Sequence, residues 1–139
     1  MFERVLVPVD LSDKNQRALL QALEMIDPEQ STIHMVHVIE TIQGIEFDEL
    51  SDFYQDLERK ARGGLVDLSN VLEDRSIPCR REVLFGHRAA EIIRFAEEAG
   101  CDLIVMTSHS QSDEHPHAGF GTISHQVALL ADCPVLLLR

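Results

Sequence analysis

The sequence is poor in the residues that mark several classes of protein. Its 139 residues include three cysteines, no tryptophan and only 12 Lys and Arg. The cysteines form no CxxC pair, so a zinc ribbon or a thiol redox motif is not indicated, and reduced thiols in a cytosolic protein are the simplest interpretation. The N-terminal apolar run is too short for a signal peptide and no later run could span a bilayer, so we expect a cytoplasmic protein.

Positive charge is scarce as well. The chain carries 24 Asp and Glu against 12 Lys and Arg, which gives a net charge of −12 at neutral pH. Such a field repels the backbone of nucleic acids and anionic membranes, so neither is an expected partner. It also opposes a polyanionic ligand, which would need backbone donors or a metal counter-ion at its site. The acidity itself is accounted for by solubility.

Five short apolar segments alternate with four amphipathic ones. The apolar segments predict strands at 4–9, 32–40, 78–85, 102–107 and 134–139, and the periodicity predicts helices from Ser12 to about 26, at 47–72, 88–99 and 122–131. Alternation of this kind predicts a parallel sheet with helices on both faces. Without an internal repeat or a linker, residues 1–139 are expected to form a single α/β domain.

Local signals refine these elements. Ser12 offers an N-cap for the first helix, and Gly100 suits the residue just past the third. Gly63 and Gly64 mark a weak point inside the second helix. The segment 78–85 is the most polar of the strands, which places it near an edge of the sheet.

In open parallel sheets a ligand sits outside the carboxyl ends of the strands, where the strand order reverses. This rule directs attention to the segments after the first and fourth strands. Asp10 follows the first strand. Its carboxylate could accept hydrogen bonds from a ribose hydroxyl or a base amino group, or it could cap the next helix beside Ser12. The sequence leaves both interpretations open.

The segment after the fourth strand ends at the start of the last helix. Gly121 would let the backbone approach a ligand, while Thr122 and Ser124 add hydroxyl groups beside the unpaired N–H groups of the first turn. A turn glycine followed by an ordinary Thr cap is the alternative. The loop also holds three His residues with Asp113 and Glu114, and these predict a solvated polar loop rather than a zinc site. His37, in the second strand, is expected to pack near the strand end.

No motif of a catalytic site is present. The chain lacks a P-loop, a GxGxxG fingerprint and a nucleophile elbow. The single Asp after the first strand and the "LFG" that ends the third argue against a receiver domain. No general base is identifiable, so we do not expect an enzyme, and a slow ATPase is a minor alternative.

Four stretches together carry a family resemblance. These are "VLVPVDLSDKNQRALLQAL", "IHMVHVIE", "AAEIIRFAEEAGCDLIVMTSH" and "GTISHQVALLADCPVLLLR". In this order and at this length the chain resembles the universal stress protein family. The resemblance implies a doubly wound sheet of five parallel strands in the order 3-2-1-4-5. It also implies a homodimer that pairs the last strand, "PVLLLR", with its two-fold mate, which would protect an apolar edge strand.

Some members of that family bind ATP between strands one and four. Carried over to this chain, the resemblance implies that Asp10 meets the adenosine part, that Pro8 and Val9 line the pocket, and that the backbone of Val38 reads the adenine edge. It further implies phosphate contacts at the start of the last helix. The complete implied set is Pro8, Val9, Asp10, Val38, Met106, Thr107, Ser110, Gly121, Thr122, Ile123 and Ser124.

The chain departs from the ATP-binding pattern G-x2-G-x9-G-[S/T]. The first two glycines fall on Thr107 and Ser110, and ten residues rather than nine separate Ser110 from Gly121. A Cβ at these positions opposes the close backbone approach that glycine permits. Two hypotheses follow: a dimeric regulatory protein that binds ATP or AMP, with Mg²⁺ as counter-ion, or a family member that works through protein contacts without a nucleotide. The protein partner is unknown in both cases.

Overall fold

The computed structural model describes residues 1–108 and 122–139. Within these residues, five parallel strands form one sheet in the order β3-β2-β1-β4-β5. The sheet order and the α/β class that the resemblance implied are therefore confirmed. The strands are β1 (Arg4–Pro8), β2 (Thr32–Glu40), β3 (Cys79–Gly86), β4 (Leu103–Thr107) and β5 (Val135–Leu138).

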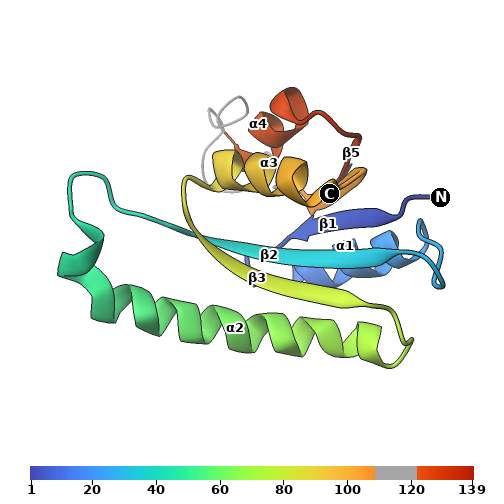
Figure 1. Ribbon diagram of the computed structural model, residues 1–139, viewed down its shortest axis with the longest axis horizontal. Helices are drawn as coiled ribbons and strands as arrows, with labels where there is room; N and C mark the ends of the chain where they lie inside the picture. Colours follow the sequence, from blue (N-terminus) through green and yellow to red (C-terminus); the bar gives the residue numbers. More distant parts are fainter. Residues whose placement is uncertain (109–121) are drawn as a thin grey trace.

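Helices cover both faces of the sheet (Figure 1). α1 (Lys14–Leu23) and α2 (Ser51–Glu73) pack on one face, where Leu19 and Leu65 meet Val5 and Val7. α3 (Arg88–Ala99) and α4 (Ile123–Leu130) pack on the other face. A single turn of 3₁₀ helix, η1 (Phe47–Leu50), precedes α2. Because alternate strand residues point to opposite faces, β1 contributes to both cores, which explains the apolar run that follows Arg4.

Three local predictions have clear outcomes. Gly100 ends α3 in the left-handed conformation, with φ of 67°, as its position suggested. Ser12 is not the N-cap of α1, since the helix begins one residue later and Asp13 occupies the cap position without a side-chain hydrogen bond. α2 continues through Gly63 and Gly64 without a break. A Cβ on Gly64 would lie 2.9 Å from Cδ2 of Leu11, so the glycine allows the β1–α1 loop to approach the helix.

The two edges of the sheet differ in polarity. β3 forms one edge and exposes its charged residues, as expected from its sequence. β5 forms the other edge with the sequence VLLL, of which Leu137 is 36% exposed. None of the helices among residues 1–108 and 122–139 is both long and apolar enough to cross a membrane.

Candidate functional site

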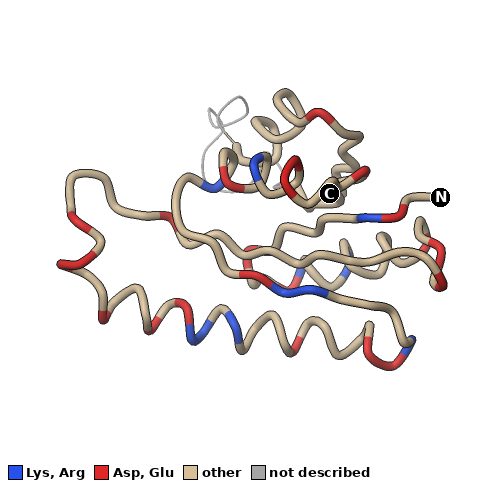
Figure 2. The backbone as a smooth tube through the Cα atoms, viewed as in Figure 1, with Lys and Arg blue, Asp and Glu red and all other residues tan. Residues whose placement is uncertain are grey.

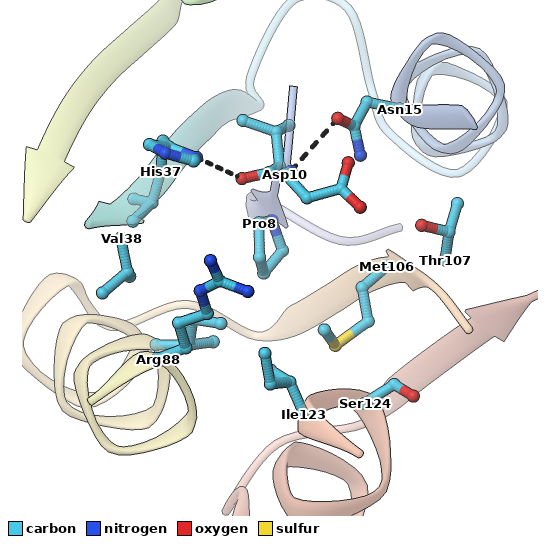
Figure 3. A pocket seen from close by; sticks show the side chains of 13 residues that line it. Pro8, Asp10, Asn15, His37, Val38, Arg88, Met106, Thr107, Ile123 and Ser124 are labelled. Atoms are coloured by element: carbon cyan, nitrogen blue, oxygen red, sulfur yellow. Dashed lines mark hydrogen bonds between the residues drawn. The ribbon is translucent and has the colours of Figure 1, made fainter. Parts of the chain in front are cut away.

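A cleft opens at the carboxyl end of the sheet, where β1 and β4 diverge (Figure 3). Its cavity volume is about 80 Å³, and its mouth is open to solvent. Its walls are largely apolar, with a few polar groups directed inward. The lining residues are Pro8, Val9, Asp10, Asn15, Val36, His37, Val38, Arg88, Ile92, Met106, Thr107, Ile123 and Ser124.

The β1–α1 loop fixes Asp10 at the mouth of this cleft. The backbone N–H of Asp10 donates to Oδ1 of Asn15 at 3.1 Å, and Oδ1 of Asp10 accepts from the N–H of Ser12 at 2.9 Å. The second bond is the local turn that Asp commonly forms with a residue two positions later. The carboxylate of Asp10 therefore orders the loop and lines the cleft, but it does not cap α1, whose cap position is held by Asp13.

β2 turns its backbone toward the cleft beyond the end of β1. The N–H of Thr32 donates to the carbonyl of Glu3, and the carbonyl of Val36 accepts from the N–H of Val9. The backbone N–H and C=O groups of even-numbered β2 residues therefore point toward β1. In a parallel sheet this alternation continues along the strand. The last registered pair between the two strands is Pro8 with Val36. The N–H and C=O of Val38 therefore point past the end of β1, at the cleft that Val38 lines.

The two histidines of β2 have different environments. Nδ1 of His37 lies 2.8 Å from the carbonyl oxygen of Val9, and His37 lines the cleft. His34 is only 8% exposed and packs edge-on against Phe95 of α3, with ring centroids 5.6 Å apart. Burial, reinforced by the charge of Arg80, lowers the pKa of His34. His37 packs near the strand end, as expected, and this position also makes it part of the cleft lining.

Arg88 brings a positive charge into the cleft. It is the first residue of α3, and Figure 3 shows its side chain directed between Pro8 and Val38. Its Nε lies 3.8 Å from Oε2 of Glu40 at the end of β2. Among the described lining residues, Arg88 alone carries a permanent positive charge. In a chain of net charge −12, it is a local exception that favours an anionic ligand.

The start of α4 forms the opposite wall. Thr122 is the N-cap, and its Oγ1 accepts from the N–H of His125 at 3.3 Å. Ile123 and the buried Ser124 line the cleft from the first turn. The N–H groups at a helix start are not used within the helix and the helix dipole is positive there, so this wall suits an anion.

Eight of the eleven residues that the resemblance implied meet in this cleft; they are Pro8, Val9, Asp10, Val38, Met106, Thr107, Ile123 and Ser124. Thr122 caps the adjoining helix instead of lining the cleft. Ser110 and Gly121 lie outside the described residues, as do three His residues, Asp113 and Glu114 of the loop. Among the residues described, no cluster of three or more His, Cys, Asp or Glu could hold a metal ion.

Sequence reasoning missed Asn15 and Arg88. Asn15 is 2% exposed although it lies in a helix whose neighbouring residues are solvated. A buried polar residue in the first turn of a helix that follows a strand end is a signal that could have been used. Arg88 could have been found by applying the switch-point rule to the helix that follows the third strand, since that helix starts at the same edge of the sheet.

The family model that describes the "Universal stress protein family" matches residues 1–139. The chain belongs to the universal stress protein family. It is 29% identical over 150 residues to "Universal stress protein YxiE" of Bacillus subtilis, with complete coverage of both chains.

Two solved structures of universal stress proteins have the same fold. One is a universal stress protein in complex with cAMP, with a TM-score of 0.76, 18% identity and coverage of 99% of this chain and 97% of that one. The other is the universal stress protein from Archaeoglobus fulgidus in complex with dAMP, with a TM-score of 0.71, 19% identity and coverage of 99% and 98%. At this identity the likeness concerns the fold.

Proposed function

We propose that this universal stress protein binds an adenine nucleotide, ATP or AMP, in the cleft between β1 and β4. The observation that carries the proposal is the convergence of three groups on one cleft. These are the Asp10 carboxylate, the outward-facing backbone of Val38 and the first turn of α4. Two structural relatives in complex with cAMP and dAMP add support from within the family.

Each part of a nucleotide finds suitable chemistry. The N–H and C=O of Val38 can pair with the donor and acceptor edge of adenine, between apolar walls that include Ile92 and Met106. Asp10, an exposed carboxylate, can accept from a ribose hydroxyl. Phosphates would lie at the start of α4, beside Ser124 and the N–H groups of the first turn.

Charge sets a limit on the phosphates. The net charge of −12 opposes a triphosphate, and in the described part of the cleft the helix dipole and Arg88 offset it. Asp10 is the only carboxylate among the described lining residues, so Mg²⁺ would be held mainly by the phosphates themselves. We therefore expect Mg²⁺ to accompany ATP as a counter-ion rather than to occupy a site built by the protein.

We also propose that the site binds the nucleotide without turning it over efficiently. Among the described lining residues, Asp10 and His37 could serve as a base, and both lie on the wall opposite the start of α4, where the phosphates would lie. His37 is bonded to the carbonyl of Val9, and Asp10 accepts from Ser12. The nucleotide would then act as a signal of cellular state that the protein passes to a partner.

A homodimer through β5 is part of the same proposal. The N–H of Ser108 donates to the carbonyl of Leu138, and the N–H of Ile104 donates to the carbonyl of Pro134. The backbone groups of even-numbered residues in 134–138 therefore point toward β4. By alternation the backbone groups of Val135 and Leu137 face the open edge. An apolar edge of this kind is protected when it pairs with a second copy. Leu137→Pro would remove one outward N–H and should yield a monomer in light scattering, whereas Leu137→Ala should stay a dimer.

The binding proposal is tested with Asp10 and a neighbour of the same charge. Asp10→Ala should weaken binding of a fluorescent ATP analogue about 10- to 100-fold, because a hydrogen bond to a charged group contributes about 1.5–3 kcal/mol. Asp13→Ala changes the net charge equally in the same loop but lies outside the cleft, so its affinity should match the wild type within about twofold. Asp10→Asn keeps an oxygen that accepts from the N–H of Ser12 but removes the negative charge. It therefore separates the effect of loop order from the effect of the carboxylate on nucleotide binding. Equal affinity of Asp10→Ala and wild type would refute the assigned site.

A further inference from the structure

A second surface lies beyond the cleft, in the segment that joins β2 to α2 and in the first turn of α2. Four large apolar side chains are exposed there: Ile42 (47%), Ile45 (41%), Phe47 (47%) and Phe53 (50%). Single exposed apolar residues are common, but four within twelve positions are not explained by the core. We call these four residues the β2–α2 patch.

The patch rests on a rigid base. Tyr54 is 1% exposed, and its hydroxyl accepts from the N–H of Ile42 at 2.9 Å. Phe47 stacks on Tyr54 with ring centroids 4.9 Å apart and an angle of 5° between the rings. Phe85 of β3 meets both rings edge-on, and Phe53 lies 5.5 Å from Tyr54. These contacts hold Ile42, Phe47 and Phe53 in place before any partner arrives, which lowers the entropy lost on binding.

The patch projects from the body of the molecule. Figure 1 shows the segment after β2, together with the first turns of α2, extending beyond the ends of β2 and β3. α2 has 23 residues and is therefore about 34 Å long, and its first turn carries the exposed Phe53. The projecting part is accessible to another molecule from several sides.

Acidic residues surround the patch. Residues 41–58 contain six Asp and Glu and no Lys or Arg, half of the net charge of −12 (Figure 2). Asp56 and Glu58 form ion pairs along α2 with Arg59 and Arg62. Four carboxylates are exposed and form no ion pair with any described residue; they are Glu46, Asp48, Glu49 and Asp52.

Helix stability explains only part of this arrangement. Asp48, Glu49 and Asp52 lie in the first turns of η1 and α2, where negative charge is favourable. That effect accounts for carboxylates at these positions but not for the exposed rings of Phe47 and Phe53 between them. An apolar centre with a polar rim is the usual composition of a docking surface, and a rim of one charge favours a partner of the opposite charge.

We propose that the β2–α2 patch, with the four exposed carboxylates around it, binds a partner protein through a basic amphipathic helix. The partner would place aliphatic or aromatic side chains on Phe47 and Phe53 and Lys or Arg opposite the acidic rim. A second copy of this chain does not fit, because a two-fold contact here would set the same carboxylates against one another. This proposal goes beyond nucleotide binding and does not depend on it.

The test uses a model peptide of 18 residues, built from Leu and Lys in helical periodicity with one Trp on its apolar face. Because the protein has no tryptophan, the emission of the peptide reports binding directly. The full chain should bind it with a blue shift in emission. The affinity should fall at least fivefold between 50 and 300 mM salt, since charged rims are screened.

Two variants and one control separate the contributions. Phe53→Gln should weaken binding at least fivefold, and Glu49→Gln with Asp52→Asn should weaken it and flatten its salt dependence. Val66→Gln removes a comparably exposed apolar side chain (44%) farther along α2 and should bind within twofold of wild type. Equal losses in Phe53→Gln and Val66→Gln would overturn the proposal. So would equal binding of a scrambled peptide of the same composition, or loss of self-association in Phe53→Gln.

Discussion

Replacing Asn15 tests how the β1–α1 loop is held. Asn15 is 2% exposed, and its Oδ1 accepts the backbone N–H of Asp10 at 3.1 Å. Asn15→Ala removes that acceptor and leaves a partly buried N–H without its partner, which costs about 1–3 kcal/mol. At a urea m-value of about 2 kcal/mol/M, a loss of about 2 kcal/mol lowers the unfolding midpoint by about 1 M.

The assay is equilibrium unfolding in urea, followed by far-UV circular dichroism. Gln16→Ala is the matched control, because Gln16 is the next residue in α1 and its side chain is exposed. Its free energy of unfolding should stay within about 0.5 kcal/mol of wild type, which shifts the midpoint by at most about 0.25 M. If Asn15→Ala unfolded at the same midpoint as Gln16→Ala, the bond between Asn15 and Asp10 would not hold the loop, and the stated role of Asn15 would be wrong.

Two further predictions concern titration. Burial and Arg80 lower the pKa of His34 below its ordinary 6.5, so the unfolded chain binds a proton that the folded chain does not, and the free energy of unfolding should fall as the pH drops below about 6.5. His34→Leu should reduce this loss, and an unchanged pH profile would contradict it. Burial raises the pKa of Cys79 and Cys101 to about 11, so both should react slowly with iodoacetamide at pH 8 in the native protein and quickly in urea. Their contribution to stability should be complete below pH 9 and disappear toward pH 11, and rapid native alkylation at pH 8 would contradict both statements.

The elements of the fold could be predicted from the sequence because each follows from local apolar patterning. After the exposed Arg4, β1 is apolar because both faces of the strand are covered, and the polar residues of β3 reflect its edge position. Strand order could not be obtained from periodicity and came from the family resemblance. The Ser12 cap was wrong because the loop uses Asp10 and Asn15 for its hydrogen bonds and α1 begins later.

The position of the candidate site could be predicted, whereas its full composition could not. The switch-point rule led to Asp10 and to the start of the last helix, which do meet at one cleft. Asn15 and Arg88 were missed because their roles depend on tertiary geometry. The side chain of Asn15 bonds to the backbone of Asp10, five residues earlier. Arg88 reaches the cleft from the start of α3, the helix that follows β3 in the sequence.

The central claim is that the cleft binds an adenine nucleotide. It is tested most directly by isothermal titration of ATP, with and without Mg²⁺, into protein from which any bound nucleotide has been removed. We predict saturable binding of one nucleotide per chain with a dissociation constant near the micromolar range, or about −8 kcal/mol. Absence of binding at millimolar ATP and AMP would contradict the claim, and would leave protein contacts as the function of this family member.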